Sequence, residues 1–288
     1  MRFVLQTLLV VLSSLTFAGF ANAVTWGEPD DGEHPAVGTL LFFDGNGVGL
    51  FSCTGTMISP WVMLTAAHCV ETDGKPNAAT FVRFDDNAVG DFSPPLLGWL
   101  SDKWIAADSV EAHPKWDDYA TFPITYDIGV VVLSEPVSLS GYAEIPEVGF
   151  LAGLKGKDKQ SFTTVGYGLQ AFLGGPVQLQ DPPVDAPVFY SADYVKQKGD
   201  VKLIELNSQF SGYGLSSARF SNNPGIGGGS CYGDSGGPTF FKDTNILVAV
   251  TSFGIAKNSY CMGNDFNYRT DTQEAAGFIE DMLKKYPL

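Results

Sequence analysis

Short apolar or alternating runs, separated by turn residues, follow one another along most of this chain. Clear examples are VGTLLFF, FVRFDDN, DIGVVVL, QSFTTVGYG and NILVAVTSFG. Such runs, rich in β-branched and aromatic residues and separated by Gly, Pro, Asn and Asp, are typical of β-strands. The pattern predicts an all-β protein.

One segment near the C-terminus follows a different period. In DTQEAAGFIEDMLKK, residues 271–285, apolar side chains recur at helical spacing. They are Ala275, Phe278, Ile279, Met282 and Leu283. Asp271 and Glu274 stand in capping-box positions, so an amphipathic helix is expected over 271–285.

The N-terminus has the pattern of a secretory signal peptide. Met1-Arg2 precedes an apolar run, Phe3 to Phe20, which is followed by the small residues Ala-Asn-Ala. We expect residues 1–23 to be removed and Val24 to be the first residue of a secreted, extracellular protein. The alternative, an uncleaved membrane anchor, is disfavoured because a run of about 18 residues is at the short limit for spanning a bilayer. With the signal removed, no membrane association is expected.

Charge narrows the range of partners. The chain has 17 Lys and Arg against 32 Asp and Glu, a formal net charge of −15. Nucleic acids and anionic membranes bind basic surfaces, so neither is expected as a partner. The glycine-rich NNPGIGGGS lacks the Lys-Ser or Lys-Thr that would follow in a phosphate-binding loop, and no cofactor is predicted.

The four cysteines are expected to form disulfides in a secreted protein. Four cysteines allow three connectivities, and the pairs closest in sequence are Cys53 with Cys69 and Cys231 with Cys261. A zinc site is not expected, because neither spacing matches a zinc motif and the chain has only 3 histidines.

A candidate nucleophile lies in GGGSCYGDSGGPTFF, residues 227–241, where Ser235 is surrounded by glycines. Glycine-rich backbone can turn its amides toward a ligand. The base for this serine must be sought among His34, His68 and His113, and His68 lies in the apolar run MLTAAHCV. Asp127 opens the apolar strand DIGVVVL, where a buried carboxylate needs a partner. His34 and His113 have ordinary structural explanations in turns or strands.

The three segments LTAAHC, YDIGVVVL and CYGDSGGP, in this order, resemble the chymotrypsin/trypsin family of serine endopeptidases. The resemblance extends over essentially all of the chain from Val24. It implies two six-stranded antiparallel β-barrels with a C-terminal helix: a first barrel at about 24–145, a second at about 146–270, and a polar join around 134–160. The site would lie in the cleft between the barrels.

The resemblance also implies residue roles. Ser235 would be the nucleophile, His68 the general base and Asp127 its orienting carboxylate, with the amides of Gly233 and Ser235 as the oxyanion hole. Gly233-Asp234-Ser235-Gly236-Gly237 also matches the nucleophile elbow of esterases, but that fold places its histidine after the serine, and no histidine follows Ser235.

Activation follows from the same resemblance, which implies an ion pair between Asp234 and the free amine of Val24. Between Arg2 and Lys75 the chain has no Lys or Arg, so tryptic cleavage ahead of the first barrel is excluded. Our hypothesis is that removal of the signal peptide itself creates the activating amine.

The specificity pocket is less typical of trypsin. Gly229, followed by Ser230, stands where trypsin-like members carry an aspartate. The resemblance assigns Ser252, Phe253 and Gly254 to the segment that pairs with the substrate backbone.

Two alternatives remain for the rest of the pocket: Phe266 lines and shortens it, or Asp265 supplies a charge. The missing aspartate favours uncharged, apolar residues before the cleaved bond. A monomer acting on proteins or peptides is expected, and a catalytically silent relative that binds proteins through the same cleft is the alternative.

Overall fold

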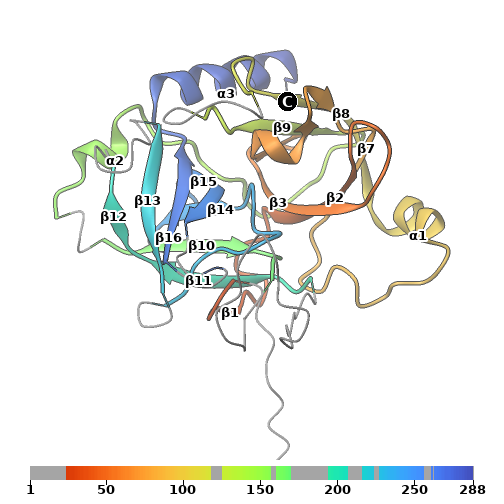
Figure 1. Ribbon diagram of the computed structural model, residues 1–288, viewed down its shortest axis with the longest axis horizontal. Helices are drawn as coiled ribbons and strands as arrows, with labels where there is room; N and C mark the ends of the chain where they lie inside the picture. The colour runs from red at the N-terminus through yellow and green to blue at the C-terminus, as the bar shows by residue number, and fades with distance from the viewer. Residues whose placement is uncertain are drawn as a thin grey trace, which may run out of the picture.

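The computed structural model describes residues 24–117, 125–156, 160–169, 194–206, 216–223, 227–255, 261 and 263–287. The predicted signal peptide, residues 1–23, lies outside this range. Two β units stand side by side with a helix across the top (Figure 1). The predicted all-β class is confirmed.

The first unit is a closed barrel of six antiparallel strands in the order β2-β3-β4-β9-β8-β7. The strands are β2 (Val37–Phe43), β3 (Phe51–Met57), β4 (Val62–Thr65), β7 (Ala79–Arg83), β8 (Ile105–Ala112) and β9 (Gly129–Leu133). Apolar side chains that fill the interior, among them Leu40, Leu64 and Val131, are 0% exposed. Beside the barrel, β5 (Glu71–Thr72) and β6 (Lys75–Pro76) form a small hairpin.

The second unit is an eight-stranded curled sheet in the order β1-β11-β10-β14-β15-β16-β13-β12. Its six longer strands are β10 (Phe162–Gly166), β11 (Gln197–Val201), β13 (Ser217–Asn222), β14 (Pro238–Phe241), β15 (Leu247–Ile255) and β16 (Gly263–Arg269). Two short strands, β1 (Glu28–Pro29) and β12 (Leu203–Glu205), lie at its edges. Within the described residues the six longer strands curl into a half-barrel, in agreement with the predicted chymotrypsin-type architecture.

The first strand and the last helix of the described residues each pack on the unit that is more distant in the sequence. Strand β1 precedes the first barrel but pairs with β11 of the second unit, with Glu28 opposite Lys198. Helix α3 (Gln273–Lys285) follows the second unit but packs on the first barrel, where Phe278 lies against His113 and Lys285 pairs with Glu111 of β8. The boundaries at about 145 and 270 stay a prediction.

Helix α3 confirms the predicted C-terminal helix and corrects its cap. The cap is Thr272, whose hydroxyl accepts a hydrogen bond from the Ala275 amide at 3.2 Å. Asp271 instead accepts hydrogen bonds from Arg269 and from the amide of Leu151. A threonine at this position satisfies a first-turn amide and leaves the aspartate free for the arginine.

The described residues contain two further α-helices that the periodicity did not reveal. They are α1 (Leu96–Lys103) and the short α2 (Phe150–Gly153), and a 3-10 turn, η1 (Ala67–Cys69), follows β4. Among the described residues, no helix is long and apolar enough to cross a membrane.

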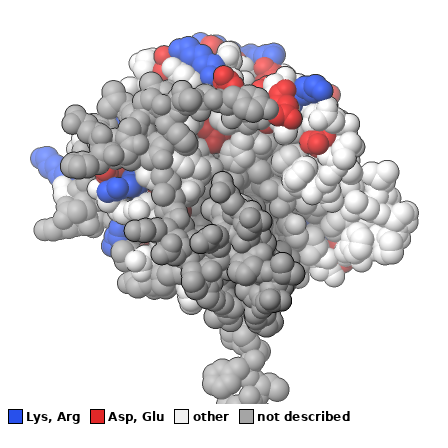
Figure 2. Space-filling view, in the orientation of Figure 1, with Lys and Arg blue, Asp and Glu red and all other residues white. Residues whose placement is uncertain are grey.

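Charged side chains of both signs are intermixed along α3 (Figure 2). Lys284 pairs with Glu280 and Lys285 with Glu111, in each case at 2.6 Å. On this face the described residues thus form no continuous basic patch.

Candidate active site

His68 and Asp127 are held together by one pair of strands of the first barrel. His68 lies in η1 directly after β4, and Asp127 lies just before β9. These strands pair with Thr65 opposite Gly129, so the two side chains emerge side by side. The His68 Nδ1 lies 2.9 Å from Asp127 Oδ2, and the His68 amide donates to Asp127 Oδ1 at 3.0 Å.

Asp127 is buried at 3% exposure yet is stabilised as a carboxylate. Burial raises its pKa, but the charge and hydrogen bonds of His68 and the Ser252 hydroxyl outweigh burial and hold the pKa below its usual value. The Ser252 hydroxyl donates to the same oxygen that faces the imidazole. Sequence reasoning placed Ser252 beside the substrate and missed this bond, because it joins strand β15 of the second unit to the first barrel.

Ser235 stands in a tight loop that the first barrel holds in place. Gly233 has φ +96°, a conformation that favours glycine. The carbonyl of Gly233 accepts from the Thr54 hydroxyl at 2.9 Å, and the carbonyl of Ser235 accepts from the Thr54 amide at 2.8 Å. Both carbonyls are thus directed toward β3, which fixes the orientation of the peptide units around Ser235.

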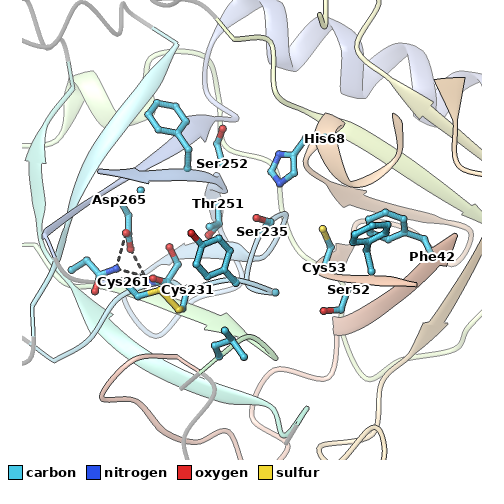
Figure 3. A pocket seen from close by; sticks show the side chains of 18 of the residues that line it. Phe42, Ser52, Cys53, His68, Cys231, Ser235, Thr251, Ser252, Cys261 and Asp265 are labelled. Carbon is cyan, nitrogen blue, oxygen red and sulfur yellow. Dashed lines mark hydrogen bonds between the residues drawn. A yellow bond between two sulfur atoms is a disulfide. The ribbon is translucent and has the colours of Figure 1, made fainter. Parts of the chain in front are cut away.

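Ser235 and His68 line the same cavity, whose volume is about 800 Å³. Figure 3 shows the two side chains next to each other near its centre, with Asp265 on one side and Phe42 on the other. The cavity is also lined by the following predicted site residues: Gly233, Ser230, Ser252, Phe253 and Gly254. The predicted triad and pocket segments therefore meet around one space.

Asp265 provides a carboxylate at one end of the cavity. Its Oδ2 accepts from the Ser230 amide and its Oδ1 from the Asn222 side chain, each at 2.7 Å. Burial raises the pKa of Asp265 to about 6, and the N–H donors of Ser230 and Asn222 limit the rise. Of the two sequence alternatives, Asp265 lines the cavity, whereas Phe266 is buried and stacks on Phe253 with ring centroids 5.0 Å apart.

Asp234, next to the nucleophile, points away from the cavity. It is 1% exposed, and its two oxygens accept from the amides of Gly168 and Cys231, each at 2.8 Å. Burial raises the pKa of Asp234 well above its usual value, and the nearby charge of Asp265 adds to this. A buried carboxyl group with a raised pKa is stabilised in its ionised form when a cation lies beside it.

The N-terminal segment is docked against the same region. Val24 is 0% exposed, and the Thr25 amide donates to the carbonyl of Gly229 at 3.0 Å. The segment thus lies against the residues that precede Ser235.

Two disulfides brace the site, with the pairings expected from the sequence. Cys53 and Cys69 link β3 to η1, and Cys231 and Cys261 link the nucleophile loop to the segment before β16. The His68 ring lies within 4.8 Å of the first pair of sulfurs, a grouping that could hold a metal ion with free thiols. Because the two sulfurs are bonded to each other, they offer no thiolate ligand.

The end of the cavity opposite Asp265 is apolar. It is lined by Phe42 of β2, by Leu50, and by Phe51, the first residue of β3. The rings of Phe42 and Phe51 lie 5.8 Å apart, and Phe51 is 52% exposed.

Comparison with known proteins agrees with this geometry. The family model described as Trypsin matches residues 25–269. The chain belongs to the trypsin family. It is a serine endopeptidase, a hydrolase that acts on proteins or peptides.

Two relatives of this trypsin-family chain are peptidases by name. Brachyurin of Leptuca pugilator is 28% identical over 231 residues, which cover 79% of this chain and 84% of the relative. Chymotrypsin-C of Bos taurus is 29% identical over 248 residues, covering 82% and 79%. A solved structure titled HL collagenase has a TM-score of 0.64 at 16% identity, with 92% of this chain and 99% of that one covered, and confirms the chymotrypsin-type fold.

Proposed function

We propose that this trypsin-family chain cleaves peptide bonds through Ser235, His68 and Asp127. The observation that carries the proposal is the His68 imidazole, which is bonded to a buried carboxylate and lines the same cavity as Ser235. The Ser235 Oγ attacks the scissile carbonyl while His68 Nε2 takes its proton. The protonated imidazole then gives the proton to the leaving amine, and water hydrolyses the acyl-enzyme by the same steps.

Asp127 has two tasks in this mechanism. Its carboxylate fixes the imidazole tautomer that carries hydrogen on Nδ1, and it stabilises the imidazolium. The low pKa of Asp127 supports this role, because the group is then ionised at neutral pH.

The amides of Gly233 and Ser235 form the oxyanion hole in this proposal. The Thr54 hydrogen bonds to both carbonyls support it, since they keep the loop from reorganising as negative charge develops.

The Val24 amine, freed by removal of residues 1–23, pairs with Asp234 and orders the oxyanion loop. The buried position of Val24 and the raised pKa of Asp234 support this activation step. The protein acts as a secreted monomer, which is consistent with the secretory pattern at its N-terminus and with the typical location of family members.

The residue before the cleaved bond enters the end of the cavity at Asp265. The sequence favoured an apolar preference because Gly229 carries no carboxylate, but that expectation did not include the Asp265 carboxylate at this end of the cavity. We favour basic side chains above a pH of about 6, since Asp265 is then ionised and a cation offsets its burial. Below that pH Asp265 is protonated, and we expect basic and uncharged side chains to be accepted equally well before the cleaved bond.

Cleavage of a diverse peptide library tests the proposal. The secreted protein is expected to cut it, and Ser235→Ala to abolish cutting, while the exposed control Ser101→Ala cuts like the wild type. The residues before each cut, compared at pH 8 and pH 5, report the preference. If a correctly processed protein beginning at Val24 cuts nothing, the protein-binding alternative replaces this proposal.

A further inference from the structure

Asn222 links the N-terminal segment to the acidic end of the cavity. It is the last residue of β13 and is 2% exposed. Its Nδ2 donates to the Ser230 carbonyl and to Asp265 Oδ1, each at 2.7 Å. Its Oδ1 accepts from the Thr25 hydroxyl at 3.1 Å.

The orientation of this amide is determined by its neighbours. A carbonyl and a carboxylate on one side can only accept, so the NH₂ group must face them and Oδ1 must face Thr25. Rotation of the amide would place two acceptors against its oxygen. Thr25 therefore fixes the side of Asn222 that faces Asp265.

Gly229 makes room for this arrangement. A Cβ at position 229 would overlap the side-chain carbon and oxygen of Asn222. The same residue holds Thr25, because the Gly229 carbonyl accepts from the Thr25 amide at 3.0 Å and lies 2.9 Å from the Thr25 hydroxyl, whose single hydrogen it shares with Asn222 Oδ1. Thr25, Asn222 and Asp265 thus form a buried chain of hydrogen bonds that ends at Asp265, which lines the cavity.

The remaining acceptor capacity of Asp265 is directed to the cavity that it lines. An ionised carboxylate has about four lone-pair sites, of which the Asn222 side chain and the amide and side chain of Ser230 use three. A carboxylate that is 3% exposed is stabilised most by a cationic hydrogen-bond donor. This end of the cavity fits a guanidinium, amidinium or ammonium group.

We propose that Asn222 is a positioning residue which, held by Thr25 of the N-terminal segment, aims the Asp265 carboxylate at a basic side chain preceding the cleaved bond. This inference rests on the proposed function and deepens it. Docking of the N-terminal segment then affects the selectivity for a basic residue before the cleaved bond, and it also orders the oxyanion loop.

Thr25→Val tests the link, because valine keeps the shape of threonine and removes its hydroxyl. The measured quantity is the ratio of kcat/KM for two peptides that differ only in arginine or leucine before the cleaved bond. We expect this ratio to fall about three- to tenfold, the effect of one lost hydrogen bond. The matched variant Thr25→Ser, which keeps the hydroxyl, should retain the ratio to within about twofold.

The pH profile gives a readout that a merely structural role would not move. The ratio should rise with pH as Asp265 ionises, at about 6 in the wild type. The charged groups facing this site are Asp265 itself and the buried Asp234. Loosening Asn222 weakens a donor that stabilises the carboxylate, so the midpoint should move to higher pH in Thr25→Val.

Two results would overturn the inference. One is a parallel loss for both peptides in Thr25→Val, with an unchanged ratio and midpoint. The other is an unchanged ratio in Asp265→Asn, which would mean that the carboxylate does not recognise the substrate. N-terminal sequencing and thermal unfolding of each variant establish that it is processed and folded.

Binding of benzamidine, a flat aromatic cation, separates this inference from the proposed function because it needs no turnover. Calorimetry should show weaker binding to Thr25→Val and to Asp265→Asn than to the wild type. If the wild type binds benzamidine in this pattern but cleaves nothing, the proposed function fails and the inference stands. If it cleaves peptides but the variants bind benzamidine as tightly as the wild type, the inference alone fails.

Discussion

The two β units are both built from antiparallel strands, but they bury different kinds of side chain. The first is a closed barrel with an apolar interior, where Leu40, Leu64 and Val131 are fully buried. The second is a curled sheet that buries polar groups within its structure, including Asp234, Asp265 and Asn222 at 1 to 3% exposure. The first unit positions His68 and Asp127, the proposed acid–base pair, and the second supplies Ser235, the proposed nucleophile, and the Asp265 end of the cavity.

The two units also differ in how they hold the residues of the candidate active site. A strand pair of the closed barrel places His68 and Asp127 side by side, and hydrogen bonds between them and from Ser252 fix their side chains. Around Ser235, by contrast, the geometry depends on individual hydrogen bonds from Thr54, Asn222 and the backbone. Substitutions in the second unit should therefore alter selectivity more readily than substitutions in the barrel.

The largest expected effect comes from substituting Ser235 and His68, singly and together, which tests whether the two units depend on each other for catalysis. Ser235→Ala removes the nucleophile of the second unit, and His68→Ala removes the base of the first. Each is expected to lower kcat by about a millionfold, and the double variant to lose no more, because the residues act as a unit. Single-turnover hydrolysis of a peptide measures this. Losses that multiply in the double variant would contradict it.

The next effect isolates the barrel's contribution. Asp127→Asn should lower kcat about 10⁴-fold at neutral pH, because an amide stabilises the wrong imidazole tautomer. Ser252→Ala removes one hydrogen bond to the same carboxylate, raises its pKa, and should lower kcat only about three- to tenfold. Steady-state kinetics on one peptide compare the two variants. Equal losses would show that the second unit orients the histidine as strongly as the barrel does.

A pH profile examines the second unit's dependence on the Val24 amine. Paired with buried Asp234, the amine should have a pKa raised above its ordinary value of about 8. The pair contributes its full stabilisation below the ordinary pKa, and activity should fade as pH rises through the raised value. Asp234→Asn should cost about 10²- to 10³-fold in kcat at every pH, comparable to losing an oxyanion donor.

The control for this profile is a correctly processed protein. Edman sequencing must begin at Val24, and a different first residue would contradict the activation step. Activity that stays constant up to pH 11, with the folded state preserved by circular dichroism, would also contradict the pairing.

The smallest expected effect concerns the apolar end of the cavity. Phe51→Ser should lower kcat/KM about threefold to tenfold for peptides with a large apolar residue after the cleaved bond, because it removes exposed aromatic surface beside the site. Peptide esters that end at the cleaved bond serve as the control and should be unaffected. Equal losses of kcat/KM on both substrates would show that Phe51 contributes to the stability of the barrel and not to substrate binding.

Much of this protein is determined locally in its sequence. The alternating runs correspond to strands such as β2 and β9, and the helical period over residues 271–285 corresponds to α3. The segments around His68, Asp127 and Ser235 could be recognised because each is contiguous, with its chemistry and its strand or turn signals within a few residues. The two disulfides follow the cysteines that are closest in sequence.

Only the tertiary structure determined the rest of the cavity. Asp265 faces Ser230 across 35 positions of sequence, and Asn222 meets Thr25 across 197. The register of β16 against β13, with Asp265 opposite Phe220, selects which of Asp265 and Phe266 lines the cavity. Neighbouring residues of a strand point to opposite faces, so a shift of one residue would exchange them. Strand register depends on pairing between distant segments, and local periodicity carries no information about it.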